Sequence, residues 1–178
     1  MGKKITMQIL EKLSFGLSRQ VPTILQTEAT ECGLACIAMV AHYYGFESDL
    51  ITLRRRFPVS QKGTNLNHLL KISNQLKLVT RPLKLELEDL EQLKTPCILH
   101  WDFNHFVVLQ HVSSSKVTIS DPAFGKRVLS LEEVSEHFTG VALELWPDTE
   151  FEKKEEKNQI QLRSLIGHVR GLWKSLGQ

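Results

Sequence analysis

The sequence predicts an α+β fold in which helices from the first half of the chain pack on an antiparallel sheet formed by the second half. Two observations support this prediction. Up to about residue 77, apolar residues recur at helical spacing, and beyond it they alternate with polar ones as strands do. Turn-forming residues separate the alternating stretches at short intervals, which favours hairpins and therefore antiparallel pairing.

Three helices are expected in the first half. They cover residues 32–44, 50–57 and 65–76, with N-caps at Thr30, at Ser48 or Asp49, and at Thr64, in that order. The first is apolar along almost its whole length and stops at Gly45, which predicts a buried helix. The run Arg54 to Arg56 on the second helix is typical of a solvated face.

The second half predicts strands joined by turns and two short helices. The strands cover residues 78–85, 97–101, 105–112, 116–121, 127–130 and 140–146, and the short helices cover 86–93 and 131–138. A tight turn at Ser113 to Ser115 sets Val112 opposite Lys116, and this register sets Leu109 opposite Ile119.

Length and composition predict one ordinary domain. The chain has 178 residues, of which 42% are hydrophobic and 24% charged, and its formal net charge is +2 with both signs well mixed. This balance predicts no nucleic-acid partner. Three cysteines, an odd number, argue against a disulfide framework and for a reducing compartment. No uncharged apolar run approaches the ~18 residues that a membrane span needs.

Composition also divides the chain into four parts. Residues 1–20 form a weakly amphipathic arm, 21–147 the domain, and 148–158 a charged linker that buries little. Residues 159–178 form a basic amphipathic helix, which is expected to lie on a membrane surface, on a partner, or back on its own domain.

Cys32 is the first candidate functional residue, because it stands where a polar loop meets the buried helix. A thiol at a helix start feels the positive end of the helix dipole, which favours the nucleophilic thiolate. Gly33 is expected to leave room for a substrate backbone, and Gln26, on the preceding loop, could donate to an oxyanion. The alternative is that Cys32 only packs in the core, as most free cysteines do and as Cys36 is expected to.

His105 and Asp121 are the candidate partners of this thiol. A nucleophilic cysteine needs a histidine within hydrogen-bond reach and a third group that orients the ring. In the predicted hairpin, His105 and Asp121 lie on one face at its open end, as diagonal or directly opposed neighbours. His42 lies too far along the Cys32 helix, and His111, at the closed end of the hairpin, is expected to be structural.

With these residues in hand, the chain resembles the papain-like peptidase domains that begin bacteriocin-exporting ABC transporters, the double-glycine leader peptidases. The chain is similar in particular to the colicin V and microcin exporters of Gram-negative bacteria, whose peptidase domains carry a sequence like residues 94–102. The resemblance covers about residues 20 to 147 and rests on three segments. They are Leu25-Gln26 with Glu31-Cys32-Gly33-Leu34-Ala35, His105-Phe106-Val107-Val108-Leu109, and Asp121-Pro122-Ala123 with Gly125.

The resemblance implies a papain-like fold and a cysteine endopeptidase that cleaves a bacteriocin or microcin precursor after Gly-Gly before export. Cys32 would be the nucleophile, His105 the general base and later acid, Asp121 the orienting carboxylate, and Gln26 with the Cys32 N–H the oxyanion hole. Apolar residues of 50–57 and 66–76 are candidates for binding the leader helix. The domain itself would need no cofactor or metal.

The resemblance also implies partners outside this sequence. These are the leader peptide, the transmembrane and nucleotide-binding domains of the same transporter, a membrane fusion protein and an outer-membrane channel, with ATP and Mg serving only the nucleotide-binding domain. The expected location is the cytoplasmic face of the bacterial inner membrane.

Two other functions remain open at this point. One is a non-catalytic relative that holds the peptide for export, against which the presence of Cys32, His105 and Asp121 argues. The other is a metal or redox site at Cys32 and Cys36, one helical turn apart. Glu31 is an oddity beside a thiolate, and its side chain is expected to point to solvent.

Overall fold

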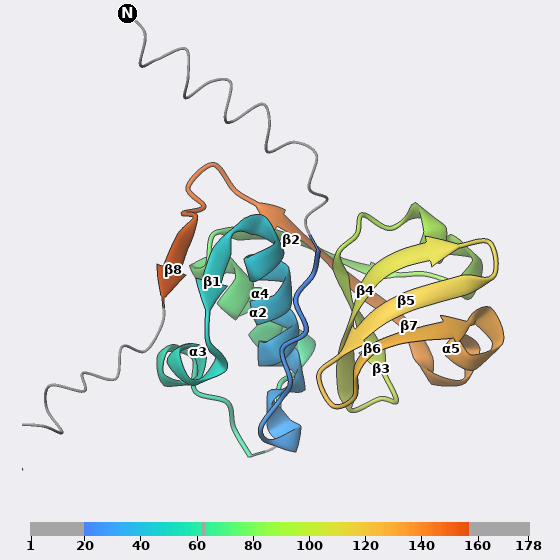
Figure 1. Ribbon diagram of the computed structural model, residues 1–178, viewed down its shortest axis with the longest axis horizontal. Helices are drawn as coiled ribbons and strands as arrows, with labels where there is room; N and C mark the ends of the chain where they lie inside the picture. The colour runs from blue at the N-terminus through green and yellow to red at the C-terminus, as the bar shows by residue number, and fades with distance from the viewer. Residues whose placement is uncertain (1–19, 62, 157–178) are drawn as a thin grey trace, which may run out of the picture.

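The computed structural model describes residues 20–61 and 63–156, and it has the predicted α+β architecture. Helices from the first half lie against a strongly twisted antiparallel sheet of six strands in the order β2-β7-β3-β4-β5-β6 (Figure 1). The sheet strands are β2 (Leu78–Lys84), β3 (Cys97–Trp101), β4 (His105–Ser113), β5 (Lys116–Asp121), β6 (Gly125–Ser130) and β7 (Phe138–Pro147).

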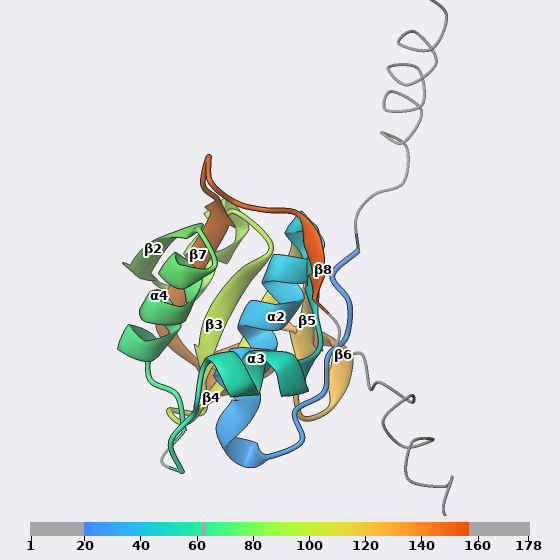
Figure 2. The same cartoon turned by 90° about the vertical axis from the view of Figure 1, so that its left-hand side faces the viewer.

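The helical layer consists of three helices and a short helical turn before them. These are η2 (Ala29–Glu31), α2 (Cys32–Tyr44), α3 (Leu50–Arg56) and α4 (Leu66–Gln75). Helix α2 lies between the sheet and α3, whereas α4 packs beside α2 and directly against β2 (Figure 2). Ten consecutive residues of α2, from Cys32 to Ala41, are buried. This explains why its sequence is apolar all round rather than on one stripe. Gly45 ends it in the left-handed conformation, as expected.

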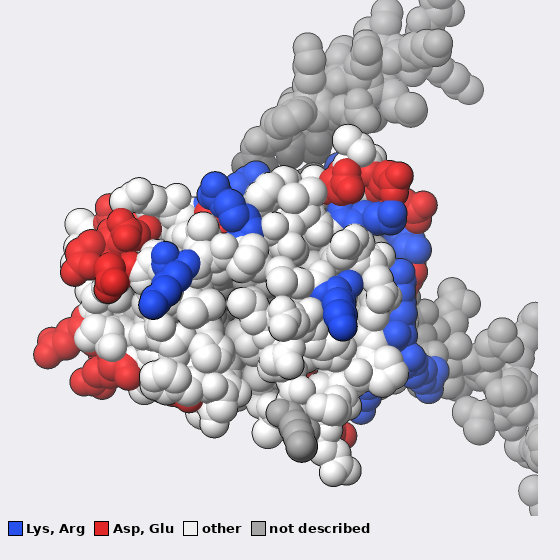
Figure 3. All heavy atoms as spheres, turned by 180° about the vertical axis from the view of Figure 1, so that it is seen from behind, with Lys and Arg blue, Asp and Glu red and all other residues white. Residues whose placement is uncertain are grey.

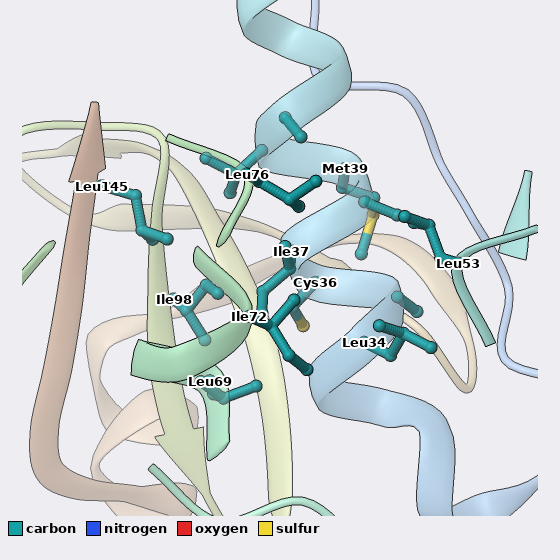
Figure 4. Packing of buried hydrophobic residues seen from close by; sticks show 14 of the residues in the cluster. Leu34, Cys36, Ile37, Met39, Leu53, Leu69, Ile72, Leu76, Ile98 and Leu145 are labelled. Atoms are coloured by element: carbon teal, nitrogen blue, oxygen red, sulfur yellow. The ribbon is translucent and has the colours of Figure 1, made fainter. Parts of the chain in front are cut away.

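Two apolar cores hold the fold together, one on each face of the sheet. The first packs α2, α3 and α4 against strands β3, β4 and β7. In Figure 4, Ile37 of α2 lies toward Ile72 and Ile98, and Met39 lies toward Leu53. The second lies on the opposite face and is closed by η3 (Leu87–Gln92) and α5 (Leu131–His137). The sheet is therefore buried on both faces, and the Cys32 helix is fixed against it.

The predicted caps differ from the observed ones in two places. The residue before α2 is Glu31 rather than Thr30, because residues 29–31 already form a helical turn. At α4 the side chain of Asn65, not Thr64, accepts the N–H of His68 at 2.9 Å. Asp49 caps α3 as expected, accepting the N–H of Thr52 at 2.7 Å.

The stretch predicted as a linker is partly built into the domain. Residues Lys154–Glu156 form β8, which pairs in parallel with β1 (Phe46–Ser48). Phe151, the one aromatic residue of this charged segment, packs against the helical core. The charged composition of this segment predicted no ordered structure. Backbone pairing with β1 and the packing of Phe151 nevertheless hold it against the domain. The predicted arm at residues 1–20, apart from Gln20, and the predicted amphipathic helix at 159–178 lie outside the described residues.

Charge is unevenly distributed over the surface. Acidic side chains gather toward the end of the molecule that carries η3 and α5, and basic ones lie mostly toward the helical end (Figure 3). Neither sign forms a continuous stripe on the described part of this face. Within the described residues, no helix is both long enough and apolar enough to cross a membrane.

Candidate active site

Cys32 is the first residue of α2, so its side chain sits where the extended segment before the helix turns into the buried core. Only 3% of the residue is exposed, and it is the first residue of the buried run of α2 within the helical core. Cys36, one turn further, is completely buried, and burial raises the pKa of its thiol well above its ordinary value. The structure thus separates a cysteine at the helix start from one within the core, as the sequence indicated.

His105 and Asp121 meet as the hairpin register requires. Leu109 pairs with Ile119 and Val108 with Ser120, so Asp121 is a diagonal neighbour of His105. The Nε2 atom of His105 lies 2.8 Å from Oδ1 of Asp121, a hydrogen bond from ring to carboxylate. The carboxylate is 1% exposed, so solvent does not screen this pair.

The predicted turn of this hairpin was wrong by one residue, yet the register at the site was right. Ser113, not Val112, pairs with Lys116, because the turn contains two residues rather than three. A bulge between Leu109 and His111 then shifts the ladder back by one residue, which restores the expected pairing of Leu109 with Ile119.

The imidazole of His105 also contacts Cys32, and its protonation reflects both partners. Burial lowers the pKa of His105, but hydrogen bonds to Asp121 and Cys32 and the charges of these two groups raise it to about 9. The ring is therefore charged near neutral pH. Since Nε2 is engaged by Asp121, the Nδ1 side of the ring remains for the sulfur.

The Asp121 carboxylate is held in its charged form by several groups. Its Oδ1 atom also accepts the N–H of Ala123 at 2.8 Å, and Arg127 Nη1 lies 3.7 Å from Oδ2. Burial raises the pKa of Asp121, but the hydrogen bonds from His105 and Ala123 and the charges of His105 and Arg127 lower it overall. Arg127 was not singled out from the sequence, although pairing β6 with β5 puts it near Asp121.

Gln26 lies on the extended segment before η2, beside the turn that follows Asp121. Its backbone N–H donates to the carbonyl of Pro122 at 2.9 Å. This bond joins the segment that carries Gln26 to the turn that follows Asp121. The side-chain oxygen Oε1 is buried and has no hydrogen-bond partner among the described residues. A buried amide oxygen without a donor is costly, so Oε1 is a candidate to accept an N–H of a ligand, whereas an oxyanion would need the amide Nε2 as its donor.

Two expectations about the neighbours of Cys32 are wrong. Gly33 does not leave open space, because a Cβ there would lie 2.6 Å from Thr64 Oγ1 and 2.7 Å from Leu69 Cδ2. The glycine instead lets α4 approach α2. Glu31 does not point to solvent: it is 2% exposed and forms an ion pair with Arg54. Arg54 is correspondingly not part of a purely solvated face.

A thiol at the start of a helix packed on an antiparallel sheet, beside an imidazole and a carboxylate carried by two strands of that sheet, is the arrangement of papain-like cysteine peptidases. Within that class, the chain belongs to the Peptidase C39 family, whose pattern it matches over residues 20–150.

Similar proteins agree with this assignment. The chain is 49% identical over 171 residues to the probable microcin-H47 secretion/processing ATP-binding protein MchF of Escherichia coli, and equally so to the colicin V secretion/processing ATP-binding protein CvaB of the same species. These alignments cover 96% of this chain and 24% of each relative, so the chain spans about a quarter of their length.

Solved structures show the same fold. The crystal structure of a double glycine motif protease from an AMS/PCAT transporter, in complex with the leader peptide, matches with a TM-score of 0.69 and 39% identity over 74% of this chain and 94% of that one. The peptidase domain of Streptococcus ComA matches with a TM-score of 0.67 and 26% identity over 72% of this chain and 100% of that one.

Proposed function

We propose that this domain cleaves the leader from a bacteriocin or microcin precursor after a Gly-Gly motif, using Cys32 as the nucleophile. The observation that carries the proposal is the position of the His105 imidazole, 2.8 Å from the Asp121 carboxylate and in contact with Cys32. Both partners favour its charged form. A protonated histidine beside a cysteine is the partner that stabilises a thiolate.

The proposed reaction has two steps. The Cys32 sulfur attacks the carbonyl carbon of the second glycine, and the negative oxygen is stabilised by the Cys32 N–H at the start of α2 and by the Gln26 amide. His105 then gives its proton to the leaving amine, which releases the cargo and leaves a thioester. In the second step His105 takes a proton from water, which hydrolyses the thioester and frees the leader. Asp121 keeps the ring oriented throughout.

The confined setting of Cys32 supports specificity for glycine. With 3% of the residue exposed, a substrate reaches the sulfur only by close approach of its backbone. Residues without side chains allow that approach, which favours glycine next to the scissile bond. The double glycine motif protease solved with its leader peptide supports this choice of substrate.

The relatives support a place for this domain within an exporter. The names of MchF and CvaB combine secretion, processing and ATP binding. We infer that this domain works at the cytoplasmic face of the inner membrane, beside transmembrane and nucleotide-binding domains that use ATP and Mg, with a membrane fusion protein and an outer-membrane channel as further partners. The apolar residues of α3 and α4 would bind the leader, and Ile51 of α3 is 51% exposed.

Cleavage of a synthetic precursor tests the proposal. A peptide containing an E. coli type leader, Gly-Gly and a short cargo is incubated with the protein and followed by mass spectrometry. We expect a single cut after the second glycine, no cut with Cys32→Ser, and full activity in Cys36→Ser, the matched control one turn away. Equal cleavage by the Cys32→Ser variant would disprove the assignment, and binding without cleavage by the unaltered protein would favour a peptide-holding module.

A further inference from the structure

Glu31, the residue directly before Cys32, is a buried carboxylate that ties together the loop carrying Gln26. Its Oε2 atom accepts the N–H of Thr27 at 3.2 Å and the N–H of Glu28 at 3.1 Å. The carboxylate thus closes the segment between Gln26 and Cys32 into a fixed turn. Since Gln26 is anchored on its other side by Pro122, both ends of the loop are held.

Arg54 of α3 neutralises this carboxylate. Its guanidinium Nε lies against Oε1 of Glu31, and the carboxylate is 2% exposed while the arginine is 36% exposed. Helix α3 reaches this position because it packs beside the start of α2 (Figure 2). The contact is electrostatic rather than an aligned hydrogen bond, because Nε and Nη2 of Arg54 are buried without a hydrogen-bond partner among the described residues.

The position of this pair matters because a negative charge beside a nucleophilic sulfur opposes thiolate formation. Because Glu31 directly precedes Cys32 in the chain, its carboxylate stays within roughly 10 Å of the sulfur. At that range an uncompensated negative charge disfavours the thiolate. An ion pair contributes little net stability when both charges must be desolvated, so stability alone explains this arrangement poorly. Orientation of the Gln26 loop explains the bonds of Glu31 to Thr27 and Glu28. Cancellation of the negative charge explains its ion pair with Arg54.

We propose that Glu31 and Arg54 are positioning residues for the peptidase reaction: Glu31 holds the Gln26 loop in shape, and Arg54 cancels the negative charge that this places beside Cys32. This inference rests on the proposed function of Cys32 and deepens it. The other charged or titratable groups around the sulfur are His105 of β4, Asp121 of β5 and Cys36 of α2, with Arg127 of β6 behind Asp121.

Four variants separate charge from shape. Arg54→Gln leaves the Glu31 carboxylate uncompensated, and Glu31→Gln keeps an acceptor for Thr27 and Glu28 but removes the negative charge. The double variant carries neither charge. Arg55→Gln, at the next position of α3 and exposed, is the matched control. For each, the rate of Cys32 alkylation by iodoacetamide is measured against pH by peptide mass spectrometry, and kcat and KM are measured on a Gly-Gly leader peptide.

We expect Arg54→Gln to raise the pH of half-maximal alkylation by about one unit and to lower kcat at neutral pH about tenfold, with KM changed less than twofold. Glu31→Gln shifts the alkylation midpoint to lower pH. The double variant returns it to the wild-type value, which a purely structural defect would not do. Arg55→Gln leaves all three quantities unchanged.

An unchanged alkylation profile in Arg54→Gln, or a double variant displaced as far as Arg54→Gln, would overturn the proposal. If Arg54→Gln does not fold, the comparison of Glu31→Gln with the double variant still tests the proposal. Identical pH midpoints of Cys32 alkylation in these two variants would contradict charge cancellation. Alkylation requires no peptide substrate. A failure of the proposed function, in which the unaltered protein cleaves nothing, is therefore distinguishable from a failure of this inference, in which cleavage is normal but the charges have no effect.

Discussion

Replacement of Asp121 tests how the charge and the geometry of the carboxylate contribute. In the structure, Oδ1 of Asp121 accepts from His105 Nε2 and from Ala123 N, each at 2.8 Å. Asp121→Asn keeps an oxygen that can accept both bonds but loses the charge. Asp121→Ala loses both the acceptor and the charge. The pair of variants therefore separates ring orientation from charge stabilisation.

The pKa of His105 sets the size of the effect. A value of about 9, against an ordinary 6.5, corresponds to about 3 kcal/mol of stabilisation of the charged ring, divided between Asp121 and Cys32. If Asp121 supplies roughly half, Asp121→Asn lowers the pH at which the imidazolium deprotonates by about one unit. Asp121→Ala also frees the ring to rotate, so kcat falls by about 10²- to 10⁴-fold.

The assay is kcat/KM on a fluorogenic Gly-Gly leader peptide from about pH 5 to 10. The proposed mechanism requires the charged ring, so activity in the unaltered protein should decline as pH rises through about 9. Asp102→Asn is the control, since Asp102 makes a similar 2.7 Å contact with His137 rather than with His105. Wild-type kcat in Asp121→Ala, or an equal shift in Asp102→Asn, would refute the reasoning.

Other consequences of the structure can be checked separately. Gln26→Ala should lower kcat by about 10²- to 10³-fold with little change in KM, and an unchanged kcat would remove Gln26 from the oxyanion hole. Gly33→Ala should lower the free energy of unfolding, measured in urea, by about 1–3 kcal/mol, because the new Cβ would clash with Thr64 and Leu69. Unaltered stability would show that α4 can move away from α2. Native protein treated with iodoacetamide should gain one adduct, at Cys32, because Cys36 and Cys97 are fully buried and burial raises the pKa of both thiols. A prompt second adduct would contradict that burial.

Stability should also depend on pH through His105. Because its pKa is raised in the folded protein, its contribution is fully present below about pH 6.5 and is lost as pH rises through about 9. Urea unfolding at pH 6.5 and 9.5 should show a loss of up to about 3 kcal/mol, and a smaller loss in Asp121→Ala. Equal loss in the two proteins would mean that other groups dominate the pH dependence.

Local patterns were sufficient to predict most of the fold. Apolar spacing located α2, α3 and α4, and alternation located the strands, because each element buries a face whose period its sequence must follow. Position at the start of an apolar helix distinguished Cys32 from Cys36. Counting along the hairpin brought His105 to Asp121, and the bulge near Gln110 offset an error in the turn that sequence could not reveal.

Features that depend on contacts between distant segments were missed. The ion pair of Glu31 with Arg54 forms only because α3 packs beside α2, and no local pattern encodes that approach. Gly33 was assigned to substrate access because the sequence does not reveal that Thr64 packs against it. Arg127 could have been found by extending the register from β5 to β6, and Phe151 was the one signal that the charged segment near β8 is anchored.

Covalent trapping tests the central claim most directly. A peptide that ends in the leader's Gly-Gly, with the last carboxyl replaced by an aldehyde, should form a thiohemiacetal with the attacking sulfur. We predict one adduct per chain by native mass spectrometry, retained in Cys36→Ser and absent in Cys32→Ser. An adduct on Cys36 or Cys97, or continued cleavage of the precursor by protein saturated with the aldehyde, would contradict attack by the Cys32 sulfur.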